Sequence, residues 1–281
     1  MSLAGLVDVL AVDPALRRAV VDVGTPTLDV TAPTALRPFA IAALAQGTGR
    51  TLLAVTATGR ESEDLVAALR CLLPPESVVE YPAWETLPHE RLSPRADTVG
   101  KRIAVLRRLA HPGEHARVAV VVAPVRSILQ PQVADLGDLT PLVVRAGDTV
   151  ELDRLVEQLV DYAYVRVDLV EKRGEFAVRG GILDVFPPTE EHPVRVELWG
   201  DDVEEVRAFA AASQRSLGLV ERGLWAPPCR EMLLTPEVRQ RAKELVEAHP
   251  ELGEILDRVA DGTPVEGMEA LAPVVARLTG K

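Results

Sequence analysis

Hydrophobic positions in the first half of the chain alternate between a helical period and an extended period. The expected helices cover residues 34–46, 60–73, 95–110 and 124–130, and the expected strands cover residues 51–56, 77–80 and 118–122. The segment 118–122 (VAVVV) is apolar at every position, as in strands that are buried on both faces of a sheet. Strands that alternate with helices predict a parallel sheet covered by helices. Residues 1–139 are therefore expected to form an α/β domain.

The pattern changes near residue 140, where shorter strands separated by turns replace the regular alternation. A strand is expected at residues 141–145 and a helix at residues 151–161. Seven of the ten aromatic residues then fall between Tyr162 and Trp225. This pattern predicts a small α+β domain at residues 140–224. Residues 225–281 are expected to be mainly helical.

The stretch 171–199 predicts paired strands, because it is rich in β-branched and aromatic residues. Gly180-Gly181 indicates a bulge or a close approach of two backbone segments. Residues 194–199 alternate with period two. Val194, Val196 and Leu198 are expected on one side, and Arg195, Glu197 and Trp199 on the other.

The side with Arg195 and Trp199 is typical of an interface anchor. A solvated face of an ordinary sheet accounts for the same pattern, since lone surface aromatics are common. Asp184 lies between two apolar residues of an expected strand. A buried carboxylate requires a partner, and Arg179 or a backbone amide is the expected one.

Composition narrows the classes of function. Among the 281 residues, 47% are hydrophobic, so the chain has enough apolar residues for a core. No run of about 20 apolar residues appears, so no membrane span is expected. The net charge of −11 argues against DNA as the main partner and is compatible with a protein partner. Two isolated cysteines fit a reducing cytosol, and no metal-ligand spacing is present.

The segment Gly47–Thr51 (GTGRT) is the candidate for a phosphate-binding loop. Such a loop has the pattern G-x-x-x-x-G-K-[ST] between a strand and a helix. Here Leu44 stands where the first glycine is required and Arg50 where the lysine is required. A helix precedes the segment and a strand follows it, which reverses the required order. We therefore expect a helix-to-strand turn at this segment.

The expected helix at 95–110 carries several basic residues on the side predicted to be exposed. These residues are Arg95, Lys101, Arg102, Arg107 and Arg108. A solvated helix face explains them, and a secondary contact with DNA or with a neighbouring domain is the alternative hypothesis.

Two long segments resemble a known family. GEFAVRGGILDVFPPTEEHPVRVELWGDDVEEVRAFAAASQRSL and YPAWETLPHERLSPRADTVGKRIAVLRRL are similar to the N-terminal part of the bacterial transcription-repair coupling factor, Mfd. The resemblance is strongest at residues 81–129 and 162–217, and the layout also resembles the damage-loading protein UvrB. It implies a degenerate ATPase-like α/β domain split into parts 1A and 1B, with a small α+β domain 2 inserted between them. Residues 1–139 correspond to 1A, 140–224 to domain 2, and 225–281 to the start of 1B.

The resemblance implies that domain 2 recruits UvrA, the damage-recognition ATPase of nucleotide excision repair. Arg179, Arg195 and Trp199 match the family's UvrA-contacting positions, and the family also accepts phenylalanine where Trp199 stands. Arg173 and Phe176 are expected to border that surface.

The family's DNA translocase, with its ATP and magnesium, and its RNA-polymerase-binding domain lie further along the chain. The resemblance therefore implies a cytoplasmic N-terminal fragment without catalysis and without a cofactor. In the longer protein a C-terminal domain masks domain 2, and RNA polymerase and double-stranded DNA are further partners. The alternative is a UvrB-like module that binds nucleotide or DNA.

Overall fold

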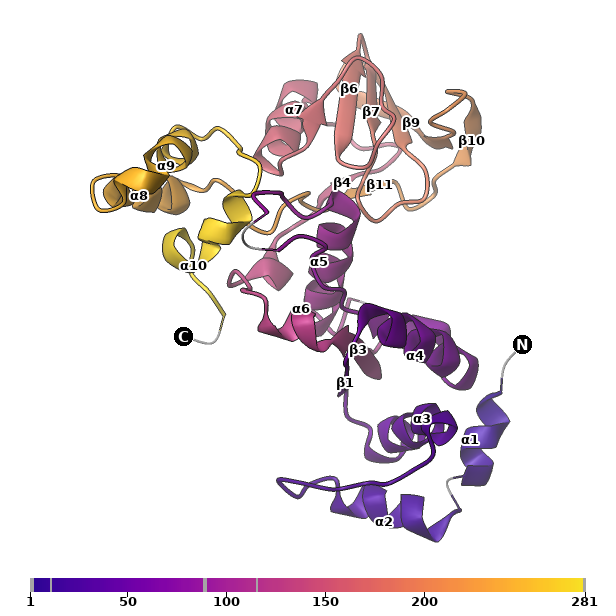
Figure 1. Cartoon of the computed structure of the whole chain (residues 1–281). Coiled ribbons are helices and arrows are strands. Elements are labelled where there is room, and N and C mark those ends of the chain that lie inside the picture. The colour runs from indigo at the N-terminus through magenta and orange to yellow at the C-terminus, as the bar shows by residue number, and fades with distance from the viewer. Residues whose placement is uncertain (1–2, 11, 88–89, 115, 280–281) are drawn as a thin grey trace. The chain divides into compact units, whose positions relative to one another are not determined.

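The computed structural model describes residues 3–10, 12–87, 90–114 and 116–279. The chain divides into two compact units (Figure 1). The first consists of Met1–Ala83 and Arg108–Gln130, and the second of Trp84–Arg107 and Pro131–Lys281. The predicted domain borders after residues 139 and 224, and the division into 1A and 1B, stay predictions.

The first unit is an α/β fold around a short parallel sheet. Its helices and strands are α1 (Ala4–Leu10), α2 (Pro14–Asp22), η1 (Thr34–Leu36), α3 (Arg37–Thr48), β1 (Leu52–Thr56), α4 (Gly59–Leu72), η2 (Pro75–Ser77), β2 (Val78–Glu80), β3 (Val120–Pro124) and α6 (Val125–Leu129). The strand order is β1-β3-β2, and both pairings are parallel. The central strand β3 is buried at every position. The prediction of a parallel sheet with helices and a fully buried strand is confirmed.

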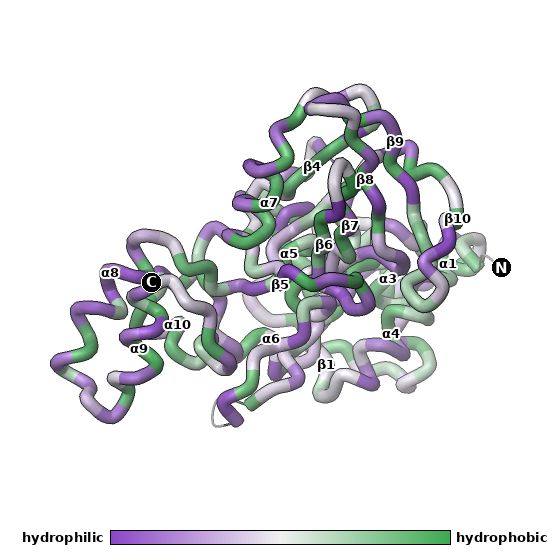
Figure 2. The backbone as a smooth tube through the Cα atoms, turned by 90° about the horizontal axis from the view of Figure 1, so that it is seen from above, coloured by the Kyte–Doolittle hydropathy of each residue, from purple (hydrophilic) through white to green (hydrophobic). Residues whose placement is uncertain are grey.

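The second unit contains a mixed sheet of six strands. These are β5 (Val165–Arg166), β6 (Glu175–Arg179), β7 (Ile182–Val185), β8 (Val194–Trp199), β9 (Asp202–Phe209) and β10 (Ser216–Leu219), in the order β10-β9-β8-β7-β6-β5. The β5–β6 pair is parallel and the other pairs are antiparallel. Antiparallel sheets often bury one face and leave the other solvated. Figure 2 accordingly shows hydrophobic and hydrophilic segments on these strands.

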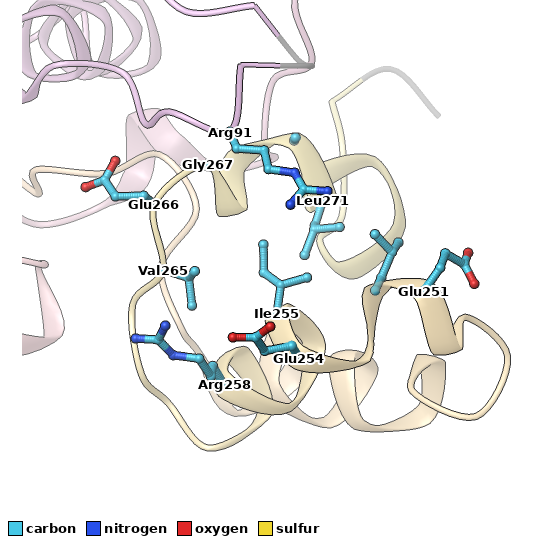
Figure 3. Close-up of a pocket in the computed structure, with 11 residues that line it drawn as sticks. Arg91, Glu251, Glu254, Ile255, Arg258, Val265, Glu266, Gly267 and Leu271 are labelled. Atoms are coloured by element: carbon cyan, nitrogen blue, oxygen red, sulfur yellow. The ribbon is translucent and has the colours of Figure 1, made fainter.

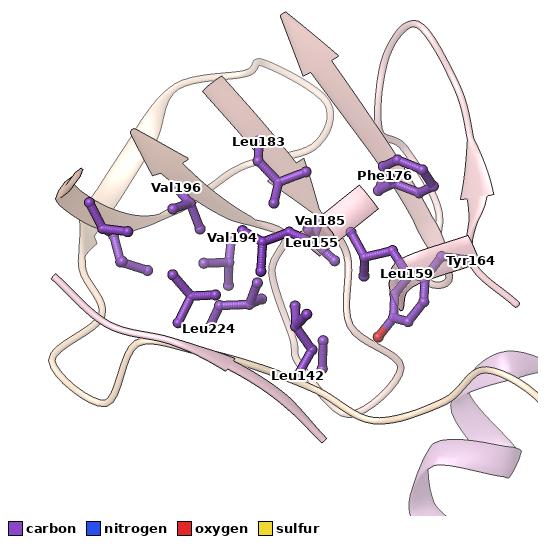
Figure 4. Close-up of a cluster of buried hydrophobic side chains, with 14 of the residues drawn as sticks. Leu142, Leu155, Leu159, Tyr164, Phe176, Leu183, Val185, Val194, Val196 and Leu224 are labelled. Atoms are coloured by element: carbon purple, nitrogen blue, oxygen red, sulfur yellow. The ribbon is translucent and has the colours of Figure 1, made fainter. Parts of the chain in front are cut away.

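One face of this sheet, the inner face, packs on a hydrophobic core. Helix α7 (Leu152–Asp161) and the two-stranded sheet of β4 (Leu142–Val144) and β11 (Leu224–Ala226) supply the other side of that core. Leu159 and Leu224 are fully buried there against Leu183 and Val196 (Figure 4). Helix α7 is strongly amphipathic, so its apolar side faces this core. The expected small α+β fold in this region is confirmed.

The rest of the second unit is helical. Its elements are α5 (Ala96–Ala110, which ends in the first unit), η3 (Leu136–Asp138), α8 (Pro236–Leu245), η4 (Pro250–Leu252), α9 (Gly253–Ala260), η5 (Met268–Leu271) and α10 (Ala272–Val275). Helices α8 and α9 share a separate apolar cluster that includes Leu256 and Met268. Residues 225–281 are mainly helical, as expected, but the helices are interrupted because Pro250 cannot continue a helix that precedes it.

Candidate protein-docking surface

The polar face of the six-stranded sheet, here called the outer face, turns away from the core of Figure 4. Its residues are Arg179, Ile182, Asp184, Arg195, Glu197, Trp199, Glu205 and Arg207. Along β8, burial alternates as the sequence predicted, with Val194, Val196 and Leu198 inside. The side with Arg195 and Trp199 is therefore the partly exposed one, and the predicted orientation of this strand is confirmed.

A buried carboxylate lies at the centre of the outer face. Asp184 is 1% exposed and is directly opposite Arg195 in the β7–β8 pair. Arg195 donates from Nε to Oδ1 at 2.7 Å and from Nη2 to Oδ2 at 2.8 Å. Arg179 donates from Nη2 to Oδ2 at 2.7 Å. The expected partnership of Asp184 with Arg179 is confirmed, and Arg195 is a second partner that sequence reasoning missed.

The bond geometry of Arg195 is that of a bidentate pair, which is stronger and more directional than a single hydrogen bond. The hydrogen bonds to Asp184 raise the pKa of the Arg195 guanidinium above its usual value, so the group stays charged. The guanidinium also lies over the ring of Phe209, 4.7 Å from its centroid. Arg195 is therefore held from two directions.

A small apolar cluster covers one end of the outer face. Its buried members are Val170, Ala177, Phe186 and Phe209. The exposed side chain of Arg173 belongs to this end, because its guanidinium lies 5.1 Å from the centroid of Phe186. Its Nε donates to the carbonyl oxygen of Glu190 at 2.9 Å. Arg179 is the last residue of β6, whereas Arg173 lies in the turn before its first residue, Glu175, so the two arginines belong to opposite ends of this strand.

The other end of the outer face is open, and Trp199 is its most prominent group. The side chain is 77% exposed at the last position of β8. Beneath it the backbone is tightly packed, because a Cβ on Gly181 would lie 2.5 Å from the carbonyl oxygen of Leu198. Leu198 in turn donates its amide to the oxygen of Gly181 at 2.8 Å. The predicted close approach of backbone at Gly180-Gly181 is confirmed.

Phe176 does not border this surface, and its expected position there is wrong. The ring is 0% exposed and belongs to the inner core (Figure 4). Phe176 and Arg179 are three positions apart on one strand, so their side chains point to opposite faces.

Sequence reasoning also missed an apolar edge beside the charged residues. Strand β10 is exposed at all four positions, including Leu217 and Leu219. Leu219 pairs with Arg207, which in turn pairs with Arg195, so these three positions form one row across the sheet. The sequence feature that could have indicated this edge strand is the short segment SLGL at 216–219, in which two leucines flank a glycine.

Of the basic residues expected on the exposed side of the helix at 95–110, Arg95 and Lys101 are exposed as predicted. The other three are engaged within the protein, which corrects their expected exposure. Arg102 is fully buried and forms an ion pair with Glu231. Arg107 is half-buried and donates to the carbonyl oxygen of Leu139 at 3.1 Å. Arg108 donates to the carbonyl oxygens of Glu76 and Ala116.

The segment Gly47–Thr51 is a helix-to-strand turn, as predicted, with Gly49 in the left-handed conformation at the end of α3. The strand-to-helix order that a phosphate-binding loop requires occurs instead between β1 and α4. The pattern G-x-x-x-x-G-K-[ST] falls there on Ala54–Glu61. Gly59 fits, whereas Ala54, Arg60 and Glu61 replace the first glycine, the lysine and the hydroxyl residue.

The side chain of Glu61 occupies this loop from within. Its Oε2 accepts a hydrogen bond from the amide of Ala57 at 3.2 Å. The hydroxyl of Thr58 accepts from the amide of Glu61 at 3.2 Å and caps the helix. A carboxylate therefore takes the place that an anionic ligand would have in a phosphate-binding loop.

Cys229 does not lie in a site that would activate its thiol. Cys229 is buried, and burial raises the pKa of its thiol far above the usual value. Burial, followed by the neighbouring Cys229, also raises the pKa of Tyr164. A neutral thiol is a poor nucleophile.

A pocket of about 310 Å³ lies between α9 and the segment around η5 (Figure 3). Ile255, Val265 and Leu271 contribute apolar surface to it, and Glu254 and Arg258 contribute charged groups. The described residues that line it include no serine, threonine, cysteine or histidine. This pocket offers no pairing of a nucleophile with a base.

Residues 142–227, which contain the entire six-stranded sheet, match the family model of the UvrB interaction domain. The chain is 47% identical, over 97% of its length, to the transcription-repair-coupling factor of Mycobacterium tuberculosis (strain CDC 1551 / Oshkosh), of which it covers 23%. The chain belongs to the transcription-repair-coupling factor family.

More distant members of this family match over most of the chain. The transcription-repair-coupling factor of Bacillus subtilis (strain 168) is 32% identical over 73% of this chain and 17% of the relative. That of Escherichia coli (strain K12) is 30% identical over 71% of this chain and 17% of the relative. The chain thus spans less than a quarter of the length of these relatives. Within the described ranges, no helix is long and apolar enough to cross a membrane.

Proposed function

We propose that the outer face docks UvrA, and that the chain thereby links UvrA to RNA polymerase stalled at DNA damage. The observation that carries the proposal is the presence of two exposed groups, Arg179 at the end of β6 and Trp199 at the end of β8, on the open end of the outer face. Arginine and tryptophan are the side chains most enriched among residues that dominate binding energy. The match to the UvrB interaction domain and the names of the relatives support this choice of partner.

The proposal assigns no catalysis and no cofactor to residues 1–281. Two observations support this. Three positions of the phosphate-binding pattern are replaced in the loop Ala54–Glu61, and the carboxylate of Glu61 accepts the hydrogen bond of the Ala57 amide. A phosphate would meet the carboxylates of Glu61, Glu63 and Asp64 near the start of α4. Titration with labelled ATP is expected to give no binding, and saturable binding would favour the UvrB-like alternative.

The test is calorimetric titration of purified UvrA with residues 1–281 and with two variants. Arg179→Ala is expected to weaken binding by about 2 kcal/mol or more, which is typical of a dominant interface residue. The control is Arg154→Ala on α7, an arginine whose side chain is 78% exposed, against 48% for Arg179, and which lies on the other side of the core. Equal losses for the two variants, or no binding by the folded wild type, would contradict docking through the outer face.

The masking of the outer face in the longer protein is a separate part of the proposal. Residues 1–281 are expected to bind UvrA more tightly than the full-length protein at rest. RNA polymerase and double-stranded DNA are assigned to regions outside residues 1–281. Equal affinities of the two forms for UvrA would contradict the masking and leave the proposed docking surface unchanged.

A further inference from the structure

The pocket beside α9 is a feature separate from the outer face of the six-stranded sheet. Ile255, Val265 and Leu271 form its apolar wall. Arg91, from the segment before α5, extends over the pocket on the side of Leu271 (Figure 3). All of these residues belong to the second unit, and none of them falls within residues 142–227, the range of the UvrB interaction domain. The proposed docking of UvrA therefore leaves this pocket without a role.

The backbone of Arg91 has a conformation that residues with a side chain rarely adopt. Its φ is 50°, in the left-handed region. A Cβ on Gly267 would lie 2.5 Å from the carbonyl carbon of Arg91, so the two backbone segments can approach this closely only because position 267 is glycine. Such strain persists where the surrounding structure enforces it, and it is common at sites that hold ligands.

Hydrogen bonds of Ser93 hold the segment of Arg91 against the segment of Gly267. The Ser93 hydroxyl donates to Oε2 of Glu269 at 2.7 Å and accepts from the amide of Gly267 at 2.9 Å. The Ser93 amide donates to Oε2 of Glu266 at 3.1 Å. The backbone from which Arg91 extends is therefore fixed beside the pocket, two residues before Ser93.

Two of the acidic residues that line the pocket are engaged elsewhere. Glu266 accepts from the amide of Ser93 and lies 3.6 Å from Nη2 of Arg230. Glu251 lies 3.2 Å from Nδ1 of His249. Both carboxylates point away from the pocket in Figure 3. Neither is therefore placed to neutralise a cation inside it.

The remaining charged groups leave a positive charge at Arg91. Glu254 lies one turn before Arg258 on α9, so the two side chains share a helix face and offset each other's charge. Within the described part of the chain, the side chain of Arg91 has no hydrogen bond or ion pair. The pocket thus combines an apolar wall with a guanidinium whose donors are available to a ligand.

We propose that this pocket binds a small aliphatic carboxylate, with its carboxylate group on Arg91 and its alkyl chain on the apolar wall. A guanidinium matches a carboxylate through two parallel hydrogen bonds, which gives both strength and orientation. The pocket volume is about 310 Å³. At ~30 Å³ for each non-hydrogen atom, the share of one water molecule in the liquid, this volume holds a ligand of about ten such atoms. Octanoate has this size and is the probe of choice.

The test is a titration of residues 1–281 with octanoate, followed through the methyl NMR signals of Ile255, Val265 and Leu271. Octanoate is expected to shift these signals saturably, with a dissociation constant of about 1 mM or below. Octanamide has the same length and no charge, and it is expected to bind about tenfold more weakly, because hydrogen bonds between charged groups are the stronger ones. Equal binding of the two probes, or no shift with octanoate, would overturn the proposal.

Two variants assign the roles within the pocket. Arg91→Ala is expected to weaken octanoate binding by about tenfold and to leave octanamide binding unchanged. Alanine also carries a Cβ, so the left-handed backbone is no more strained than in the wild type. Ala270→Leu fills the pocket from an exposed position and is expected to abolish the binding of both probes.

The control variant is Arg154→Ala on α7, an exposed arginine that does not line the pocket. It is expected to bind octanoate as the wild type does. Wild-type affinity of Arg91→Ala for octanoate would overturn the role of Arg91. Wild-type affinity of Ala270→Leu would show that octanoate binds outside the pocket and would overturn the site itself.

Discussion

Two arginine–carboxylate clusters in the second unit use the same chemistry in opposite surroundings. In the first, here called the closed cluster, Glu231 accepts from Arg102 and from Nε1 of Trp84 at 3.0 Å. Arg102 also lies over the Trp84 ring at 5.5 Å, and its side chain is fully buried. In the second, the open cluster, Asp184 binds Arg179 and Arg195, and Arg195 lies over Phe209. Both clusters thus consist of a buried acid, arginine and an aromatic ring.

The difference between the clusters is the solvent exposure of one guanidinium. The closed cluster leaves neither charge accessible, so its contribution is to the stability and arrangement of α5 against the segment after β11. The open cluster has a buried acid and one half-exposed arginine, so charge remains for recognition. Exposure, and not residue type, separates the internal ion pair from the proposed docking site. Predictions that separate stability from binding test this distinction.

The largest effect is expected from Arg102→Met, which leaves Glu231 buried without its cationic partner. Breaking a buried ion pair in this way costs about 3–5 kcal/mol of unfolding free energy. Urea unfolding measures the loss. The control is Arg95→Met beside the same helix, since Arg95 is exposed and pairs with Asp97 at the surface. Its loss is expected to be about 0.5 kcal/mol or less, and comparable losses would contradict the contrast between closed and exposed pairs.

The aromatic residues provide the second test. Phe176→Ala removes a fully buried ring from the inner core and is expected to cost about 3 kcal/mol of unfolding free energy. Trp199→Ala removes an exposed ring and is expected to change stability by about 0.5 kcal/mol or less. Its effect should appear in the titration of UvrA instead. A large loss of stability for Trp199→Ala would show that this ring packs on the protein.

These contrasts also show what sequence reasoning can reach. Local periodicity predicts β8 correctly, because alternating side chains along one strand need no knowledge of distant segments. The same rule, applied to Phe176 and Arg179, would have placed Phe176 on the core face, so that error was avoidable. The degenerate phosphate-binding pattern in the loop after β1 could also have been found from the sequence, because the predicted strand at 51–56 is followed by a predicted helix at 60–73.

The ion pair of Arg102 with Glu231 could not be predicted from local periodicity. The two residues are 129 positions apart and belong to segments of different periodicity. The five basic residues of the predicted helix at 95–110 favour a solvated face as long as the position of Glu231 in the fold is unknown. Likewise, the bond from Arg195 to Asp184 depends on the register of β7 against β8, which the turn between them fixes in three dimensions.

A third arginine–carboxylate pair predicts a response to pH that sharpens the comparison. Burial raises the pKa of Glu269, although Arg230 and Ser93 favour its charged form. The unfolded chain releases this proton near the ordinary glutamate pKa of 4.5, and the folded protein releases it at a higher pH. Stability contributed by the neutral carboxyl is therefore lost as the pH rises above 4.5.

Urea unfolding between about pH 4 and 7 measures the contribution of Glu269 as the difference in unfolding free energy between the wild type and Glu269→Gln. The difference in unfolding free energy is expected to shift in favour of the variant as the pH rises. A shift in the opposite direction would mean that Arg230 controls the pKa of this carboxyl, as in a salt bridge that favours the charged form.

The smallest effect is expected from the basic side of α5. Arg107→Ala removes a hydrogen bond to the carbonyl oxygen of Leu139 and is expected to cost about 1 kcal/mol of unfolding free energy. Lys101→Ala, at an exposed position of the same helix, is expected to cost about 0.5 kcal/mol or less. Neither change should alter the mobility of duplex DNA in a gel-shift titration at low salt, because the guanidinium of Arg107 is directed at the protein. DNA retardation by the wild type that both variants abolish, with stability unchanged, would instead establish this helix as a DNA contact.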